Sequence, residues 1–168
     1  MAIRDGILPE FDHEMANTRR VLERVPGPRF GWRPHPRSWT LRELAVHVAT
    51  LPMWAAVTLE RDGFDLAQPD PEPRPPVETP ADLLALFDRH LAGARAAIAA
   101  AGDAAFAEPW SLRRGAAVVF TMPKLATLRG FVLNHMIHHR AQLGVYLRLM
   151  DVPVPAFYGP SADEGRAG

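Results

Sequence analysis

The chain has 168 residues and a mass of 18.6 kDa, which is enough for a domain with a sizeable hydrophobic core. Lys and Arg total 19, as do Asp and Glu, so the net charge is zero, which disfavours a protein that binds nucleic acid by neutralising phosphates. The absence of cysteine excludes disulfides, thiolate metal sites and a cysteine nucleophile.

No segment predicts a membrane anchor or an export signal. Residues 1–10 contain no long apolar run, so no signal peptide is expected. The longest uncharged apolar run, 44–59, falls short of the roughly 18 residues that a spanning helix needs. We therefore expect a cytoplasmic protein that forms one domain over 1–168, with an extended tail over 153–168.

Proline-rich loops separate four predicted helices. Of the 17 prolines, 13 cluster within 26–36, 69–80 and 153–160, where they favour loops. Between the clusters, apolar residues recur at steps of three and four, which predicts helices over 3–25, 41–61, 80–101 and 123–150. Pro52 predicts a kink in the second helix. Four amphipathic helices predict an all-α fold, a four-helix bundle with long proline-rich connections.

Local signals mark the helix starts and one hairpin. Thr40 and Glu43 form the pattern of a capping box, and Thr79 is a favourable N-cap before the third helix. Residues 110–113 and 116–121 have the character of two short strands that pair around a turn at Arg114-Gly115.

The predicted core stripe of the last helix turns polar in its middle. His135 and His139 are one turn apart, so both rings leave the same face of the helix. Seven histidines placed at random in this chain give about 0.28 such pairs, so the pair alone is a weak signal. His47 lies on the predicted core stripe of the second helix. The full stripe of the last helix is Leu125, Leu128, Val132, His135, His139, Gln142, Tyr146 and Leu149.

Three imidazoles that meet in a bundle core predict a metal site. A buried imidazole without a partner is costly, and one divalent ion can satisfy all three rings. The expected ligands are His47, His135 and His139. The alternative is three unrelated histidines, each satisfied by backbone or water. Imidazole suits zinc, nickel and iron, so the identity of the metal stays open.

The remaining histidines have less specific interpretations. His138 is turned about 100° from His139 and is expected on a flank, or as a support for a ligand. His90 is expected on a solvated face, and His35 in an exposed loop.

Several polar residues near the histidines are candidates for orienting a substrate. They are Arg140, Gln142, Tyr146 and Tyr158, with structural hydrogen bonds or packing as the alternative. Asp163 and Glu164 would serve as a base or support a ligand if the tail folds over the site. A solvated tail is the alternative for both.

Three blocks of the sequence carry a resemblance to a known family. Residues 38–47, 134–143 and 153–164 resemble the Trp-Ser/Thr turn before a helix-two histidine, the histidine block of the last helix and a tail of the DinB/YfiT-like superfamily of metal-dependent bundle enzymes. The resemblance implies an up-up-down-down bundle, a homodimer, and a divalent metal on His47, His135 and His139. It also implies a possible external low-molecular-weight thiol, which some members transfer or use in isomerising maleylpyruvate.

Two classes of function follow from these features. In the first, the protein is an enzyme whose metal activates a water or an external small thiol for attack on a small electrophile. In the second, the metal only stabilises a bundle that acts as a dimeric binding or stress-related protein. The sequence does not name the substrate of either.

Overall fold

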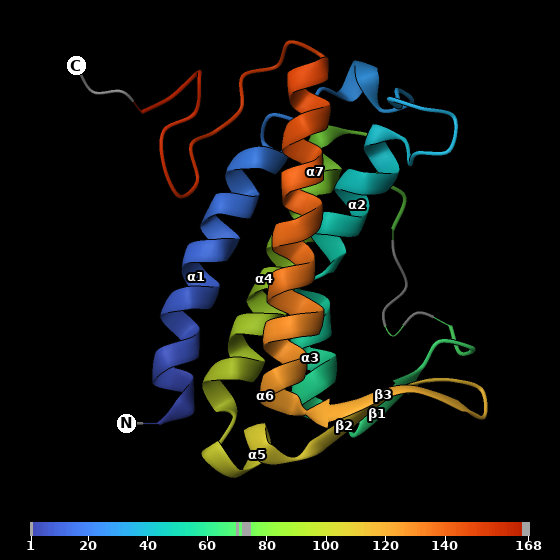
Figure 1. The fold of residues 1–168 in the computed structure, drawn as a ribbon, viewed down its shortest axis with the longest axis vertical. Coiled ribbons are helices and arrows are strands. Elements are labelled where there is room, and N and C mark those ends of the chain that lie inside the picture. Colours follow the sequence, from blue (N-terminus) through green and yellow to red (C-terminus); the bar gives the residue numbers. More distant parts are fainter. Residues whose placement is uncertain (1, 70, 72–74, 166–168) are drawn as a thin grey trace.

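The computed structural model describes residues 2–69, 71 and 75–165. Four long helical segments form the body of the fold, as Figure 1 shows. They are α1 (Ile3–Leu22), the pair α2 (Leu41–Thr50) and α3 (Met53–Glu60), α4 (Pro80–Ala100), and the run of α6 (Lys124–Thr127), η2 (Leu128–Asn134) and α7 (His135–Leu149). The shorter elements are η1 (Gly27–Arg29), β1 (Gly63–Asp65), α5 (Asp103–Ala107), β2 (Pro109–Arg114) and β3 (Ala117–Pro123).

The fold is mostly helical and not purely all-α, which corrects the predicted fold class. A three-stranded sheet in the order β1–β2–β3 closes one end of the helices (Figure 1). The pair β2–β3 is the predicted antiparallel hairpin, whereas β1 pairs with β2 in parallel and was not expected. Three residues are too few for an alternating pattern, so the sequence carries no signal for β1.

The predicted helix starts and the break at Pro52 are confirmed. Thr40 Oγ1 accepts from the Glu43 N–H, and the Glu43 carboxylate accepts from the Thr40 N–H. Thr79 and Asp82 make the same reciprocal pair at the start of α4. Pro52 separates α2 from α3, since it cannot supply the N–H that would continue the helix.

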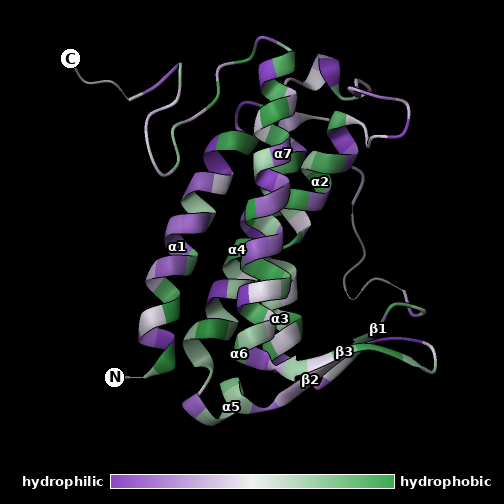
Figure 2. Cartoon of the chain, viewed as in Figure 1, coloured by the Kyte–Doolittle hydropathy of each residue, from purple (hydrophilic) through white to green (hydrophobic). Residues whose placement is uncertain are grey.

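The core lies between the inner faces of the long helices. Helix α4 packs against α1, α2 and α3, and α7 packs against α1 and α2. Each long helix carries both hydrophobic and hydrophilic residues (Figure 2), as expected for helices with one face in a core. The stripe predicted for the first helix is buried throughout, although Val25 lies beyond the end of α1: Ile7, Phe11, Met15, Thr18, Leu22 and Val25. No helix in the described part of the chain is long and apolar enough to cross a membrane.

The core stripe of the last helix lies one position later than predicted. The buried residues of α7 are Met136, Arg140, Leu143, Gly144 and Leu147, whereas His135, His139 and Tyr146 are half-buried and Gln142 and Leu149 are exposed. The reason is η2, a π-helical segment directly before His135. A π-helical turn holds more residues than an α-helical turn, so it shifts the phase of every position that follows it. The histidines therefore border the core.

His90 corrects another expectation. It was predicted on a solvated face of α4, but only 3% of its surface is exposed. Its Nδ1 lies 3.0 Å from the carbonyl oxygen of Ala49, so a hydrogen bond to α2 satisfies the buried ring.

Candidate metal centre

Three histidines from two helices converge at the border of the core. His47 comes from α2, and His135 and His139 come from α7, which packs directly against α2. One ring nitrogen from each residue lies within 4.8 Å of the others. All three side chains are half-buried, so the site is sheltered and still open to a ligand.

Hydrogen bonds fix the orientation of two of the rings. His135 Nδ1 lies 3.3 Å from the Phe131 carbonyl oxygen, and His139 Nδ1 lies 2.7 Å from Gln142 Oε1. A carbonyl oxygen only accepts, so each Nδ1 carries the hydrogen and each Nε2 keeps its lone pair. This is the usual arrangement of histidines that ligate a metal through Nε2.

The spacing of the nitrogens fits a small divalent cation. His47 Nε2 and His135 Nε2 are 3.4 Å apart. Two imidazole nitrogens on one tetrahedral ion, each at about 2.1 Å, lie about 3.4 Å from each other. The donor set also suits such an ion, because neutral imidazole binds zinc, nickel and iron. The residues present therefore fit the predicted metal.

The surroundings keep the two histidines of α7 neutral. Burial lowers the pKa of His135, and the nearby His139 and His138 lower it further. Burial also lowers the pKa of His139, against the opposing effect of its hydrogen bond to Gln142. Neutral imidazole is the form that binds a metal, so these shifts extend the binding-competent state toward lower pH.

Gln142 links His139 to His138 by hydrogen bonds. Gln142 Nε2 donates to His138 Nε2 at 3.0 Å while Gln142 Oε1 accepts from His139. The ring of His138 also packs against that of His139, with 4.9 Å between centroids. Gln142, a candidate for orienting a substrate, thus also orients a predicted ligand.

Trp39 belongs to the Trp-Ser/Thr turn noted in residues 38–47, but no role at the site was predicted for it. Its ring stacks on His139 at 5.6 Å and meets the edge of His47 at 4.9 Å. The adjacent N-cap Thr40 fixes the backbone here, and the Tyr146 hydroxyl donates to the Trp39 carbonyl oxygen at 3.2 Å. The position of this residue directly before the cap of the His47 helix is the signal that could have identified it.

A cleft of about 440 Å³ opens beside the histidines. This volume is within the usual range for a small-molecule site. It extends from the loop before α2 to the exposed side of α7. The lining residues are Arg37, Ser38, Trp39, Leu44, His139, Gln142, Val145 and Tyr146.

Arg140 lies in the core, away from the histidine cluster. It forms an ion pair with Glu14 of α1 at 2.7 Å, and the two side chains are 2% and 8% exposed. Its guanidinium also donates to the Glu14 carbonyl oxygen at 3.0 Å and to the Tyr158 hydroxyl oxygen at 2.6 Å. The guanidinium of Arg140 is therefore engaged with Glu14 and Tyr158, and these hydrogen bonds and this ion pair point to α1 and the tail, not to the predicted ligands.

The tail folds back on α1 and α7, where arginines engage its acidic groups. Glu164 pairs with Arg20 and Arg24 of α1, and Asp163 pairs with Arg148 of α7. In the described part of the chain, the histidine cluster includes neither carboxylate. The Tyr158 hydroxyl donates to Glu14 at 2.8 Å, so this residue closes the Arg140 network.

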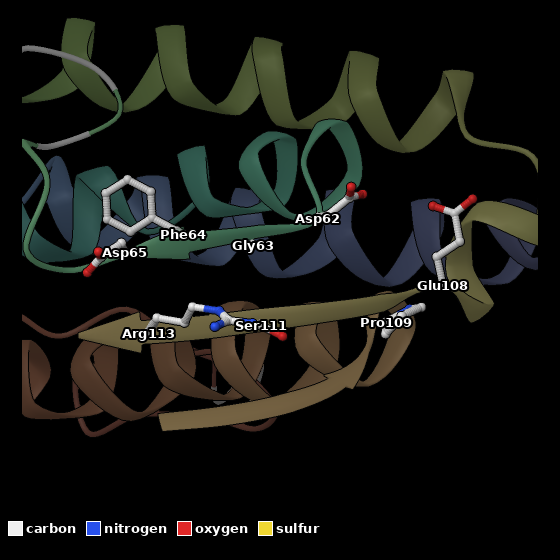
Figure 3. A pocket seen from close by; sticks show the side chains of 8 residues that line it. All are labelled: Asp62, Gly63, Phe64, Asp65, Glu108, Pro109, Ser111 and Arg113. Atoms are coloured by element: carbon white, nitrogen blue, oxygen red, sulfur yellow. The ribbon is translucent and has the colours of Figure 1, made fainter. Parts of the chain in front are cut away.

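A second cavity, of about 670 Å³, lies where β1 meets β2 (Figure 3). Figure 3 shows Asp62 and Glu108 at one end, with Asp65 and Arg113 at the other. Its acids serve the fold: Glu108 accepts from Lys124, and Asp65 accepts from two backbone N–H groups, which lower its pKa. Glu108 and Asp65 therefore have partners within the chain.

Comparisons with known proteins agree on one family. The profile of the DinB family matches residues 5–166. The Bacillus subtilis protein YrdA is 26% identical over 160 residues, which cover 95% of this chain and 90% of YrdA. Crystal structures of two DinB-like proteins share the fold at 20% identity. YjoA from Bacillus subtilis has a TM-score of 0.68, with 90% of this chain and 97% of YjoA covered. The protein from Bacillus cereus has a TM-score of 0.71, with coverage of 94% and 98%. The chain belongs to the DinB family.

Proposed function

We propose that the protein is a metal-dependent enzyme whose divalent ion is held by His47, His135 and His139. The observation that carries the proposal is the convergence of the three imidazole nitrogens beside a cleft. Among the described residues, the cluster contains three histidines and no carboxylate. Three protein ligands leave a position open, which is the pattern of catalytic sites and not of closed structural ones.

The chemistry we propose is attack on an electrophile by water or by an external small thiol. A divalent ion in the site would act as a Lewis acid and lower the pKa of either nucleophile. The chain has no cysteine, so a thiol must come from outside. Gln142 holds the His139 ring in place, Trp39 covers one side of the cluster, and the cleft seats the electrophile.

Two model reactions test this proposal. Hydrolysis of p-nitrophenyl acetate tests water, and conjugation of N-acetylcysteine with 1-chloro-2,4-dinitrobenzene tests a thiol. Protein supplied with zinc, nickel or iron should raise one of these rates at least about tenfold, which corresponds to lowering the barrier by about 1.4 kcal/mol. The rate should be lost in His135→Ala and kept in His35→Ala, whose histidine is exposed in a loop. Equal rates for wild type and His135→Ala in both reactions would refute an enzymatic role of this type.

One observation favours the structural alternative. The three histidines lie on two helices, so an ion would tie α2 to α7. A purely structural ion should be needed for folding, whereas a catalytic ion should leave a folded protein when it is removed. Thermal unfolding with and without a chelator separates the two roles. A large fall in Tm without any activity would support the structural role.

We also propose that the protein is a homodimer, as its family membership implies. Sedimentation velocity over a range of concentrations tests this, because a dimer has twice the 18.6 kDa mass of one chain. A mass of one chain at all concentrations would refute the dimer.

A further inference from the structure

We propose that the cleft beside the histidine cluster binds a small organic carboxylate with a flat apolar body, and that Arg37 binds the carboxylate. This inference rests on the proposed function in one respect, since it names the class of electrophile that the site would accept. The binding itself requires no metal.

The walls of the cleft select the body of the ligand. Trp39 and Tyr146 contribute aromatic rings, and Leu44 and Val145 contribute aliphatic side chains. Trp39 is 46% exposed and Val145 is 59% exposed, so apolar surface is available to a ligand. Flat apolar molecules gain most from such walls because ring contacts add to the burial of area.

The charge of the cleft selects the other end of the ligand. Arg37 is the one formally charged residue among the described lining, and no carboxylate accompanies it. Its guanidinium makes no hydrogen bond or ion pair with any residue that the structure describes, in contrast to Arg19, Arg95 and Arg148, which are all paired. An unpaired guanidinium presents a planar pair of donors that matches a carboxylate.

The cleft also brings such a ligand to the histidines. His139 and Gln142 line it together with Arg37, so a molecule that fills the cleft contacts both the anion site and the cluster. The acid-lined cavity of Figure 3 has the opposite character: it presents Asp62, Asp65 and Glu108. An anionic ligand is therefore expected at the histidine cleft and not at the sheet.

Equilibrium dialysis with two matched probes tests the inference. The probes are 2-naphthoate and its neutral amide, 2-naphthamide, measured on chelator-treated protein so that no metal can bind the carboxylate. Wild type should bind 2-naphthoate about fivefold more tightly than 2-naphthamide, as expected for a solvent-exposed ion pair. Arg37→Gln should remove this preference. Arg33→Gln, a matched change on the same loop outside the cleft lining, should keep it.

Trp39→Ala tests the apolar wall separately. It should weaken both probes, because each loses the same ring contact. Equal affinity of wild type for the two probes, or an unchanged preference in Arg37→Gln, would overturn the anion site. Unchanged affinity of both probes in Trp39→Ala would overturn the cleft itself. A carboxylate preference in a protein that binds no metal would support this inference while refuting the proposed function, and the reverse result would refute only this inference.

Discussion

Removing the carboxylate of Glu14 should destabilise the protein strongly. Glu14→Gln keeps the shape of the side chain and leaves the Arg140 guanidinium charged in the core, where its side chain is 2% exposed. The guanidinium keeps its bonds to the Glu14 carbonyl oxygen and the Tyr158 hydroxyl. Breaking a buried pair costs about 3–5 kcal/mol, and the retained bonds favour the lower value of about 3 kcal/mol. In a chain of this size that lowers Tm by roughly 6–12 °C.

The same substitution at an exposed pair is the control. Glu23 pairs with Arg19 one turn away on α1, and their side chains are 43% and 40% exposed. Glu23→Gln should cost less than about 1 kcal/mol, because water solvates both charges. Urea unfolding followed by circular dichroism measures the two free energies. A cost for Glu14→Gln no larger than that for Glu23→Gln would refute the account of the buried pair. The double variant Glu14→Leu/Arg140→Met should recover much of the loss, since it removes both charges.

Three further predictions concern backbone space, pH and ligand orientation. Gly63→Ala should lower the free energy of unfolding by about 1–3 kcal/mol in urea, because its Cβ would lie 2.4 Å from a carbonyl oxygen of β2. Gly93 lies within α4, and a Cβ there would meet no neighbouring atom within 4 Å. Gly93→Ala should therefore raise the free energy of unfolding by about 1 kcal/mol. The pKa values of His135 and His139 are lowered in the folded state. Below about pH 6.5 the unfolded chain therefore binds more protons than the folded chain, and the free energy of unfolding falls as the pH falls. Metal-free protein should therefore lose stability from pH 7 to 5 more steeply than the variant with leucine at both positions, and equal slopes would refute this linkage. Gln142→Leu should weaken metal binding about 10–100-fold in a competition assay with a chelator, because His139 loses the bond that orients it. Unchanged affinity would show that the bond is dispensable.

The sequence predicted features that depend on near neighbours along the chain. The capping pairs at Thr40 and Thr79 formed as expected, and so did the break at Pro52. The hairpin of β2 and β3 also formed, since its turn and both strands are adjacent in sequence. The convergence of the three histidines was predicted as well, because His135 and His139 share one helix face and His47 lies on the inner side of its own helix.

Features that depend on distant contacts or on a change of helical phase were not predicted. The steps of three and four across the last helix assume an α-helix throughout, and the π-helical η2 shifts the phase before His135. Arg140 therefore occupies a core position, and its partner Glu14 is 126 residues away in sequence. The strand that pairs with β1 is also distant in sequence, and no local pattern indicates the pairing. The arginine partners of Asp163 and Glu164 depend on how the tail returns to α1 and α7.

The metal content of purified protein tests the central claim most directly. The protein should be produced without a metal-affinity tag and supplied with zinc, nickel or iron. Wild type and His35→Ala should each hold about one divalent ion per chain, as three converging imidazoles predict. His135→Ala should lose the ion while its helical circular dichroism signal is retained. Wild-type protein that binds none of the three metals would contradict the account, and the three histidines would then be polar groups bordering the core.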